Sequence, residues 1–133
     1  MNKIIIAIML LSMSLFADFK TIGVEEFKKL QKEGLPVIDI RTEGEWKDTG
    51  IIEGAYKATF FSEKGQALLA DWFFTLGTLV KDRETPFIIY CAHASRTESL
   101  GAGLIQMGFK NVYELKGGIE NGWIKAGEKV LKE

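Results

Sequence analysis

The sequence predicts an α/β fold in which helices cover both faces of a parallel β-sheet. Segments with strand-like and helix-like patterns alternate along the chain. The segment Phe87 to Tyr90 is apolar on both faces, which is typical of a strand buried in a parallel sheet. From Leu100 the apolar residues fall at i, i+4 and i+7, which places them on one face of a helix.

Composition favours a single compact domain and excludes several classes of function. The chain has 133 residues, of which 47% are hydrophobic, enough for a buried core. Its net charge is −1 and it has no basic cluster, which argues against a nucleic-acid partner. One histidine and one cysteine cannot form a zinc site alone, and no phosphate-binding glycine motif is present. We therefore expect no metal and no other cofactor.

The N-terminal segment has the order of a secretory signal peptide. Lys3 precedes an apolar stretch over residues 4–11, and Ser12-Met13-Ser14-Leu15-Phe16-Ala17 follows, in which Leu15 is larger than the residue usual three places before a cleavage site. The apolar stretch is too short to cross a bilayer as a helix. We expect cleavage after Ala17, with residues 18–133 forming one domain in the periplasm or the medium. The alternative is an uncleaved segment that anchors the protein to the membrane.

The first elements after this site are expected to be a strand, a helix and a strand. Residues 18–22 form the first strand, and residues 24–34 have amphipathic helical spacing that ends at a glycine. The second strand covers Val37 to Ile40, at whose end lie Asp39 and Arg41. We expect these two charged residues to be a structural pair that connects strand ends, with a catalytic role as the alternative.

A short helical turn and a longer helix follow. Thr42 and Glu45 have the spacing of a capping box, so Glu45 is expected to belong to the scaffold. A third strand is predicted over residues 56–58, and the apolar spacing is helical over residues 68–80. That apolar stripe is expected to face the core. Three nearby aromatic residues are candidates for partner or substrate contacts: Phe60, Phe61 and Phe74.

The remaining elements follow the central strand. The helix that contains Leu100 is expected to end at Gly108, and residues 112–115 form the last strand. Gly117 and Gly118 then turn the chain into a final helix that contains Trp123.

Cys91 follows the central strand directly, at the edge of the sheet where α/β proteins bind ligands. Only six residues run from Cys91 to Arg96, so their backbone amides must curl around a small volume beside the sulfur. Amides at a helix N-terminus bind anions and favour a thiolate over a thiol. As the only cysteine of an exported chain, Cys91 cannot form an internal disulfide, and we expect it to be a reactive thiol.

Two blocks of residues resemble the rhodanese family of sulfurtransferases, over about Phe19 to Lys125. The matching residues are Val37-Ile38-Asp39-Ile40-Arg41, Glu45-Trp46 and Gly50-Ile51-Ile52-Glu53-Gly54-Ala55, then Tyr90-Cys91, Arg96-Thr97, Gly108-Phe109, Val112, Leu115, Gly117-Gly118 and Trp123. The resemblance implies a three-layer domain with a central five-stranded parallel sheet. It also implies that Cys91 accepts a sulfane sulfur as a persulfide and passes it to a nucleophile.

The expected partners are a small anionic sulfur donor such as thiosulfate, a thiol or other nucleophilic acceptor, and a redox partner that keeps Cys91 reduced. The loop that follows Cys91 is expected to bind the donor. Arg96 has two open roles, as a cation for the donor or as a structural group that bonds a nearby acid. His93 either donates to the donor or faces solvent. The predicted substrate-binding residues are Ala92, His93, Ala94, Ser95, Arg96 and Thr97.

Two positions depart from the family pattern. The family usually has glycine in place of Ala94 and histidine in place of Ile51. Because the loop is tight, one residue near positive φ is expected, and at Ala94 we favour that strained conformation. The alternative is a shifted backbone that turns an amide away from the sulfur. These departures keep open a binding module or sulfur carrier without turnover. A cysteine phosphatase or arsenate reductase is a third reading, but phosphatase loops of this kind place five residues between cysteine and arginine, whereas this loop has four.

Overall fold

The computed structural model describes residues 18–132. The predicted signal peptide, residues 1–17, lies outside the described residues. Within residues 18–132, no helix combines the length and the hydropathy that a membrane crossing requires.

A five-stranded parallel sheet forms the centre of the domain, in the strand order β1-β5-β4-β2-β3. The strands are β1 (Asp18–Ile22), β2 (Val37–Asp39), β3 (Tyr56–Lys57), β4 (Phe87–Tyr90) and β5 (Asn111–Leu115). All four residues of β4 are buried, because β4 lies mid-sheet with a strand on each side. The five-stranded parallel sheet expected from the sequence is therefore confirmed.

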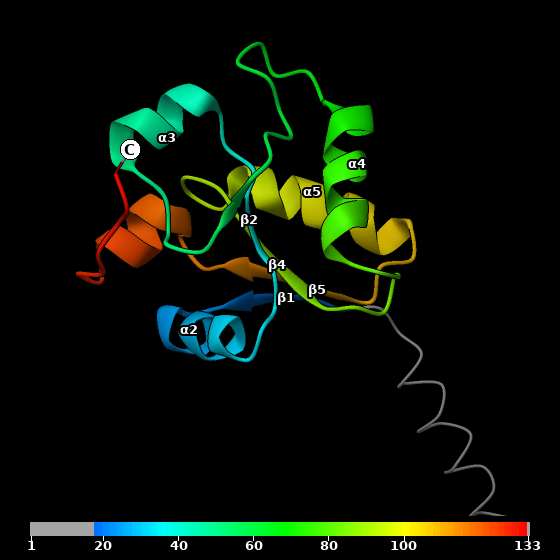
Figure 1. Cartoon of the computed structure of the whole chain (residues 1–133), viewed down its shortest axis with the longest axis horizontal. Helices are drawn as coiled ribbons and strands as arrows, with labels where there is room; N and C mark the ends of the chain where they lie inside the picture. The colour runs from blue at the N-terminus through cyan, green and yellow to red at the C-terminus, as the bar shows by residue number, and fades with distance from the viewer. Residues whose placement is uncertain (1–17, 133) are drawn as a thin grey trace, which may run out of the picture.

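Helices cover both faces of this sheet, which Figure 1 shows with α4 and α5 on one side and α2 on the other. They are α2 (Val24–Lys32), α3 (Glu43–Thr49), α4 (Leu69–Leu79), α5 (Ser95–Gln106) and the π-helix η1 (Gly118–Ile124). Each face has its own core. Trp72 and Leu104 pack against the sheet on the face of α4 and α5, whereas Phe27 and Trp123 pack on the opposite face.

The short elements differ slightly from the expected ones. The Thr42 capping box is confirmed, since the Thr42 hydroxyl accepts from the Glu45 N–H and the Glu45 carboxylate accepts from the Thr42 N–H. This cap begins a helix of seven residues rather than a single turn. The final helix is present, but it is a π-helix. These differences leave the strand order and the position of Cys91 as expected.

Candidate active site

Cys91 lies directly after β4, and its side chain is fully buried on the sheet face that α5 covers. Only residues 92–94 separate it from the first residue of α5. Its Sγ atom lies 3.8 Å from the Thr97 hydroxyl oxygen. The strand, loop and helix arrangement expected around the cysteine is therefore present.

Ala94 has a φ of 77°, and it is the one non-glycine residue with positive φ between residues 18 and 132. It occupies the N-cap position of α5 in the left-handed region. An L-residue in this region costs on the order of 1 kcal/mol. The positive φ expected at Ala94 is confirmed, so the loop adopts this conformation without the usual glycine.

The backbone amides of the loop have no acceptor within the described part of the protein. Among the residues that the structure describes, the N–H groups of residues 92–97 donate no hydrogen bond to the protein. The first bonded amide is that of Glu98, which donates to the Ala94 carbonyl at 3.0 Å. Free amides at a helix N-terminus favour an anion. That these amides bind a donor stays a prediction.

The start of η1 holds the other side of the loop backbone. The Ile119 N–H donates to the Cys91 carbonyl at 2.9 Å, and the Glu120 N–H donates to the Ala92 carbonyl at 3.1 Å. Gly118 has a φ of 66°, and a Cβ atom there would lie 2.5 Å from the Cys91 carbonyl oxygen. Sequence reasoning read Gly118 as a turn residue only and missed this contact. The paired glycines were the available signal.

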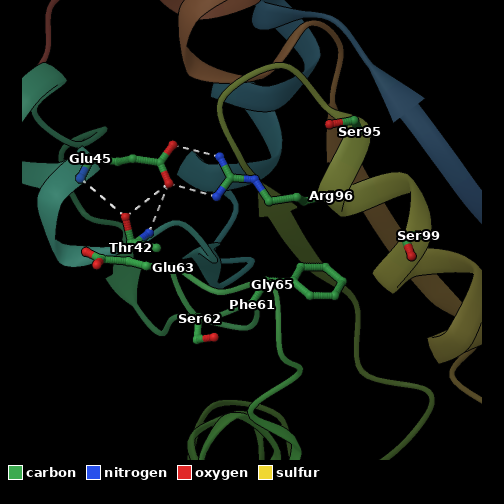
Figure 2. A pocket seen from close by; sticks show the side chains of 9 residues that line it. All are labelled: Thr42, Glu45, Phe61, Ser62, Glu63, Gly65, Ser95, Arg96 and Ser99. Carbon is green, nitrogen blue, oxygen red and sulfur yellow. Dashed lines mark hydrogen bonds and ion pairs between the residues drawn. The ribbon is translucent and has the colours of Figure 1, made fainter.

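Arg96 forms a two-pronged ion pair with Glu45, which Figure 2 shows as two side chains pointing toward one another. Both N–O distances are 2.7 Å. The hydrogen bond from Arg96 is the main reason that the pKa of Glu45 falls to about 2, and the Thr42 N–H lowers it further. The same hydrogen bond raises the pKa of Arg96. The structural role expected for Arg96, bonding to a nearby acid, is therefore present, and its role as a cation for the donor stays a prediction.

Asp39 and Arg41 form the structural pair expected at the end of β2. Both side chains are fully buried, and Arg41 Nη2 lies 2.8 Å from Asp39 Oδ2. The guanidinium also donates to the Thr49 hydroxyl at 2.6 Å and to the Gly50 carbonyl at 2.7 Å. The pair therefore anchors the end of α3 to the sheet.

The other predicted loop residues lie in three different environments. Ala92 is buried, and His93 is exposed, with Nε2 3.6 Å from a Glu120 carboxylate oxygen. The Thr97 side chain is fully buried and turned into the core, where its hydroxyl lies 2.7 Å from Glu114 Oε1. The structure thus brings Thr97 next to Cys91 and pairs His93 with an acid at the surface. Glu114 was not among the residues singled out in the sequence.

A pocket of about 590 Å³ lies beside the loop. Ser95 and Arg96 line it, whereas the buried Cys91 does not. Of the aromatic residues weighed above, Phe61 lines the pocket, Phe60 belongs to the core and Phe74 is exposed. The full lining, labelled in Figure 2, is Thr42, Glu45, Phe61, Ser62, Glu63, Gly65, Ser95, Arg96 and Ser99.

The sequence profile of the Rhodanese-like domain matches residues 23–126. The chain therefore belongs to the rhodanese-like domain family, as the resemblance predicted. This is a family of α/β domains that includes sulfurtransferases, and the fold and the cysteine loop described above agree with it.

Individual relatives differ in length and in name. The chain is 31% identical to the thiosulfate sulfurtransferase GlpE of Pseudomonas fluorescens over 104 residues, which are 78% of this chain and 84% of that protein. It is 36% identical to the tRNA uridine(34) hydroxylase of Protochlamydia amoebophila over 106 residues, but spans only 31% of that protein. A solved structure from Rhodopseudomonas palustris, titled a protein of unknown function and possible tyrosine phosphatase, is 27% identical with a TM-score of 0.59 over 85% of each chain.

Proposed function

We propose that the protein is an exported single-domain sulfurtransferase that carries a sulfane sulfur on Cys91. The observation that carries this proposal is the placement of the only cysteine at the start of a loop whose six amides have no acceptor within residues 18–132. The similarity to thiosulfate sulfurtransferase GlpE over most of both chains supports the same chemistry.

The reaction consists of two displacements at sulfur. The Cys91 thiolate attacks the outer sulfur of thiosulfate or a similar donor, a new S–S bond forms, and sulfite leaves with the electron pair of the broken S–S bond. A thiol or another nucleophile then attacks the outer sulfur of the persulfide and releases the Cys91 thiolate. Covalent catalysis of this kind divides one difficult transfer into two easier steps.

The loop supplies most of the electrostatic help in this proposal. Fixed amide dipoles stabilise developing negative charge without reorganising during the reaction. The Arg96 guanidinium is held by Glu45, so its positive charge is largely compensated. The pocket beside Ser95 and Arg96 is the place where an acceptor would approach the loop.

A binding module or sulfur carrier is the second candidate, and Ile51 favours it. Where the family usually has histidine, this chain has a buried Ile51 that pairs with Leu131 through two backbone hydrogen bonds of 2.9 and 2.8 Å. This side chain serves packing rather than chemistry. Ala94 does not favour either candidate, because it adopts the conformation that a glycine would have there.

A phosphatase is a weaker candidate. The similar protein from Rhodopseudomonas palustris is described only as a possible tyrosine phosphatase. The loop of this chain has four residues between Cys91 and Arg96, one fewer than phosphatase loops of this kind, so its ring is smaller. A sulfur atom suits the smaller ring better than a phosphate group.

Export is the part of the proposal that depends on residues 1–17. Strand β1 begins at Asp18, directly after the predicted cleavage site, so cleavage there leaves the sheet complete. The N-terminal sequence of protein recovered outside the cytoplasm is expected to start at Asp18. Recovery of the protein only from the cytoplasm, starting at Met1, would contradict export and leave the chemistry untouched. An exported thiol also needs a reducing partner.

Turnover of thiosulfate with cyanide tests the proposed reaction. Cys91→Ser is expected to abolish it, because a serine hydroxyl stays protonated near neutral pH and no second cysteine can substitute. Thermal unfolding of both proteins controls for loss of the fold. Turnover by the serine variant at the wild-type rate would exclude the mechanism, whereas a wild type that loads sulfur without turnover would favour the carrier.

A further inference from the structure

Two threonines and a glutamate form a hydrogen-bonded row in the core next to Cys91. Glu114 on β5 is only 5% exposed. Its Oε1 lies 2.7 Å from the Thr97 hydroxyl, and its Oε2 lies 2.7 Å from the Thr21 hydroxyl. The row therefore connects Cys91 to Thr97, Glu114 and Thr21, from β4 through α5 and β5 to β1.

A carboxylate in this position is costly unless its oxygens are satisfied. Glu114 faces the core on the same side of the sheet as Val112, where an apolar residue would be the ordinary choice. Both contacts are as short as hydroxyl donors to a charged carboxylate usually are. The structure thus places a buried acid close to the thiol, with only the Thr97 side chain between them.

The hydroxyl of Thr97 has a single proton and three neighbours that compete for it. The Ala94 carbonyl lies at 3.0 Å and Glu114 Oε1 at 2.7 Å. The contact to Glu114 Oε1 is the shorter of the two, which favours donation from Thr97 to Glu114. A lone pair of the Thr97 oxygen is then free to accept from the Cys91 S–H at 3.8 Å. The donors therefore follow the order Cys91, Thr97, Glu114.

We propose that Glu114 is the proton acceptor of the Cys91 thiol and acts through the Thr97 hydroxyl. The S–H bond of Cys91 breaks as its proton passes to the Thr97 oxygen, while the Thr97 proton passes to Glu114 Oε1. The products are a thiolate and a neutral carboxylic acid. No electrons are exchanged, and the pair keeps one negative charge throughout. Forming the thiolate thus adds no charge to the core.

The contacts of this row persist in both proton positions. After the transfer, the Glu114 acid donates to the Thr97 oxygen, and the Thr97 hydroxyl donates to the thiolate. The short distance between Thr97 and Glu114 serves both states, so little reorganisation is needed. The role of this row in catalysis rests on the proposed sulfur transfer, whereas the proton transfer itself does not. In that reaction the proton returns from Glu114 through Thr97 to Cys91, once the persulfide is consumed and the Cys91 thiolate is released.

Other charged groups also surround Cys91, and Glu114→Gln, the test variant proposed below, leaves all of them unchanged. Arg96 interacts electrostatically with Cys91 and with Asp39. Charged and titratable groups on the surrounding elements include Asp39 and Arg41 at the end of β2, Glu45 on α3, His93 in the loop, Arg96 and Glu98 on α5, and Glu120 on η1.

The test is the rate of Cys91 alkylation by iodoacetamide between about pH 4 and about pH 10, in wild type and in Glu114→Gln. A shared proton gives two ionisation steps, with a plateau of partial thiolate between them. We expect the wild type to show both steps and Glu114→Gln to lose the lower one. Glu98→Gln removes an exposed charge near the same helix start and is the matched control, expected to keep both steps.

A single step in wild type that moves to lower pH in Glu114→Gln would overturn the proposal, because it would show a permanently charged Glu114 that only repels the thiolate. Identical profiles in the two proteins would overturn it too. If Glu114→Gln does not fold, the wild-type profile alone decides between one step and two. Alkylation needs no sulfur donor, so a failure here is distinguishable from a failure of the proposed function.

Discussion

At the scale of single residues, Ala94 shows how this loop keeps its shape without glycine. Its φ of 77° places an alanine where a side chain is strained. The strain is worth about 1 to 2 kcal/mol, whereas replacing alanine by glycine costs about 0.4 to 1 kcal/mol through the entropy of the unfolded chain. The strain energy of the alanine is larger than the entropic advantage that it has over glycine, so the alanine destabilises the loop slightly.

Ala94→Gly is therefore expected to raise the free energy of unfolding by up to about 1.5 kcal/mol. Because the conformation is already the one a glycine would adopt, alkylation of Cys91 and turnover should stay unchanged. Urea unfolding and iodoacetamide kinetics measure the two quantities. Alkylation that accelerates about tenfold in the glycine variant would instead mean that the alanine turns an amide away from the sulfur.

At the scale of elements, the ion pair of Glu45 and Arg96 connects α3 to the start of α5. The pKa of Glu45 is lowered to about 2 from 4.5, chiefly by its hydrogen bond with Arg96. A lowered pKa in the folded state means that the pair stabilises the fold fully above about pH 4.5. This stabilisation is lost as the pH falls from there toward about 2.

Glu45→Gln is expected to lower the free energy of unfolding at neutral pH by about 1 to 2 kcal/mol, a value discounted for partial exposure. The deficit should shrink below about pH 4.5 and be mostly lost near pH 2, where about half of the wild-type carboxyl is neutral. Urea unfolding across this range measures it. Glu43→Gln, which removes an exposed pair with Lys47, is the matched control, with changes within about 0.5 kcal/mol. A deficit of Glu45→Gln that is independent of pH would contradict the assignment.

The contact between η1 and the cysteine loop gives the second prediction at this scale. A Cβ atom on Gly118 would collide with the carbonyl groups of Cys91 and Ala92. Gly118→Ala should therefore cost about 2 to 4 kcal/mol and slow sulfur loading, because the loop backbone must shift. Gly127→Ala is the control, since its φ is also positive but no atom lies within 4 Å of the new Cβ. Equal losses in the two variants, measured by urea unfolding, would show that η1 does not shape the loop.

At the scale of the whole molecule, the order of strands and helices was predictable because alternation and apolar spacing are local properties of the sequence. The five-strand count came from the family resemblance. The capping box was predictable for the same local reason, whereas the positive φ was placed at Ala94 because the family usually has glycine there. The partner of Arg96 was not, because Glu45 lies 51 residues away and only the fold brings them together.

Two further features of the site could not be predicted from local patterns. Glu114 stands in an ordinary strand sequence, and its burial follows from α5 crossing that face of the sheet. The pocket walls at residues 61–65 come from the connection between β3 and α4, whose path depends on tertiary packing. Loop paths and buried polar contacts thus become known only from the structure, whereas the helices and strands can be predicted from local sequence patterns.

The central claim is that Cys91 carries a sulfur atom as a persulfide, and the intact mass of the protein tests it most directly. Reduced wild-type protein is treated with thiosulfate, freed of excess reagent and weighed by mass spectrometry, with Cys91→Ser as the control. We expect a gain of one sulfur atom in wild type, lost on adding cyanide or dithiothreitol, and no gain in the serine variant. An unchanged wild-type mass, or an equal gain in Cys91→Ser, would contradict the claim.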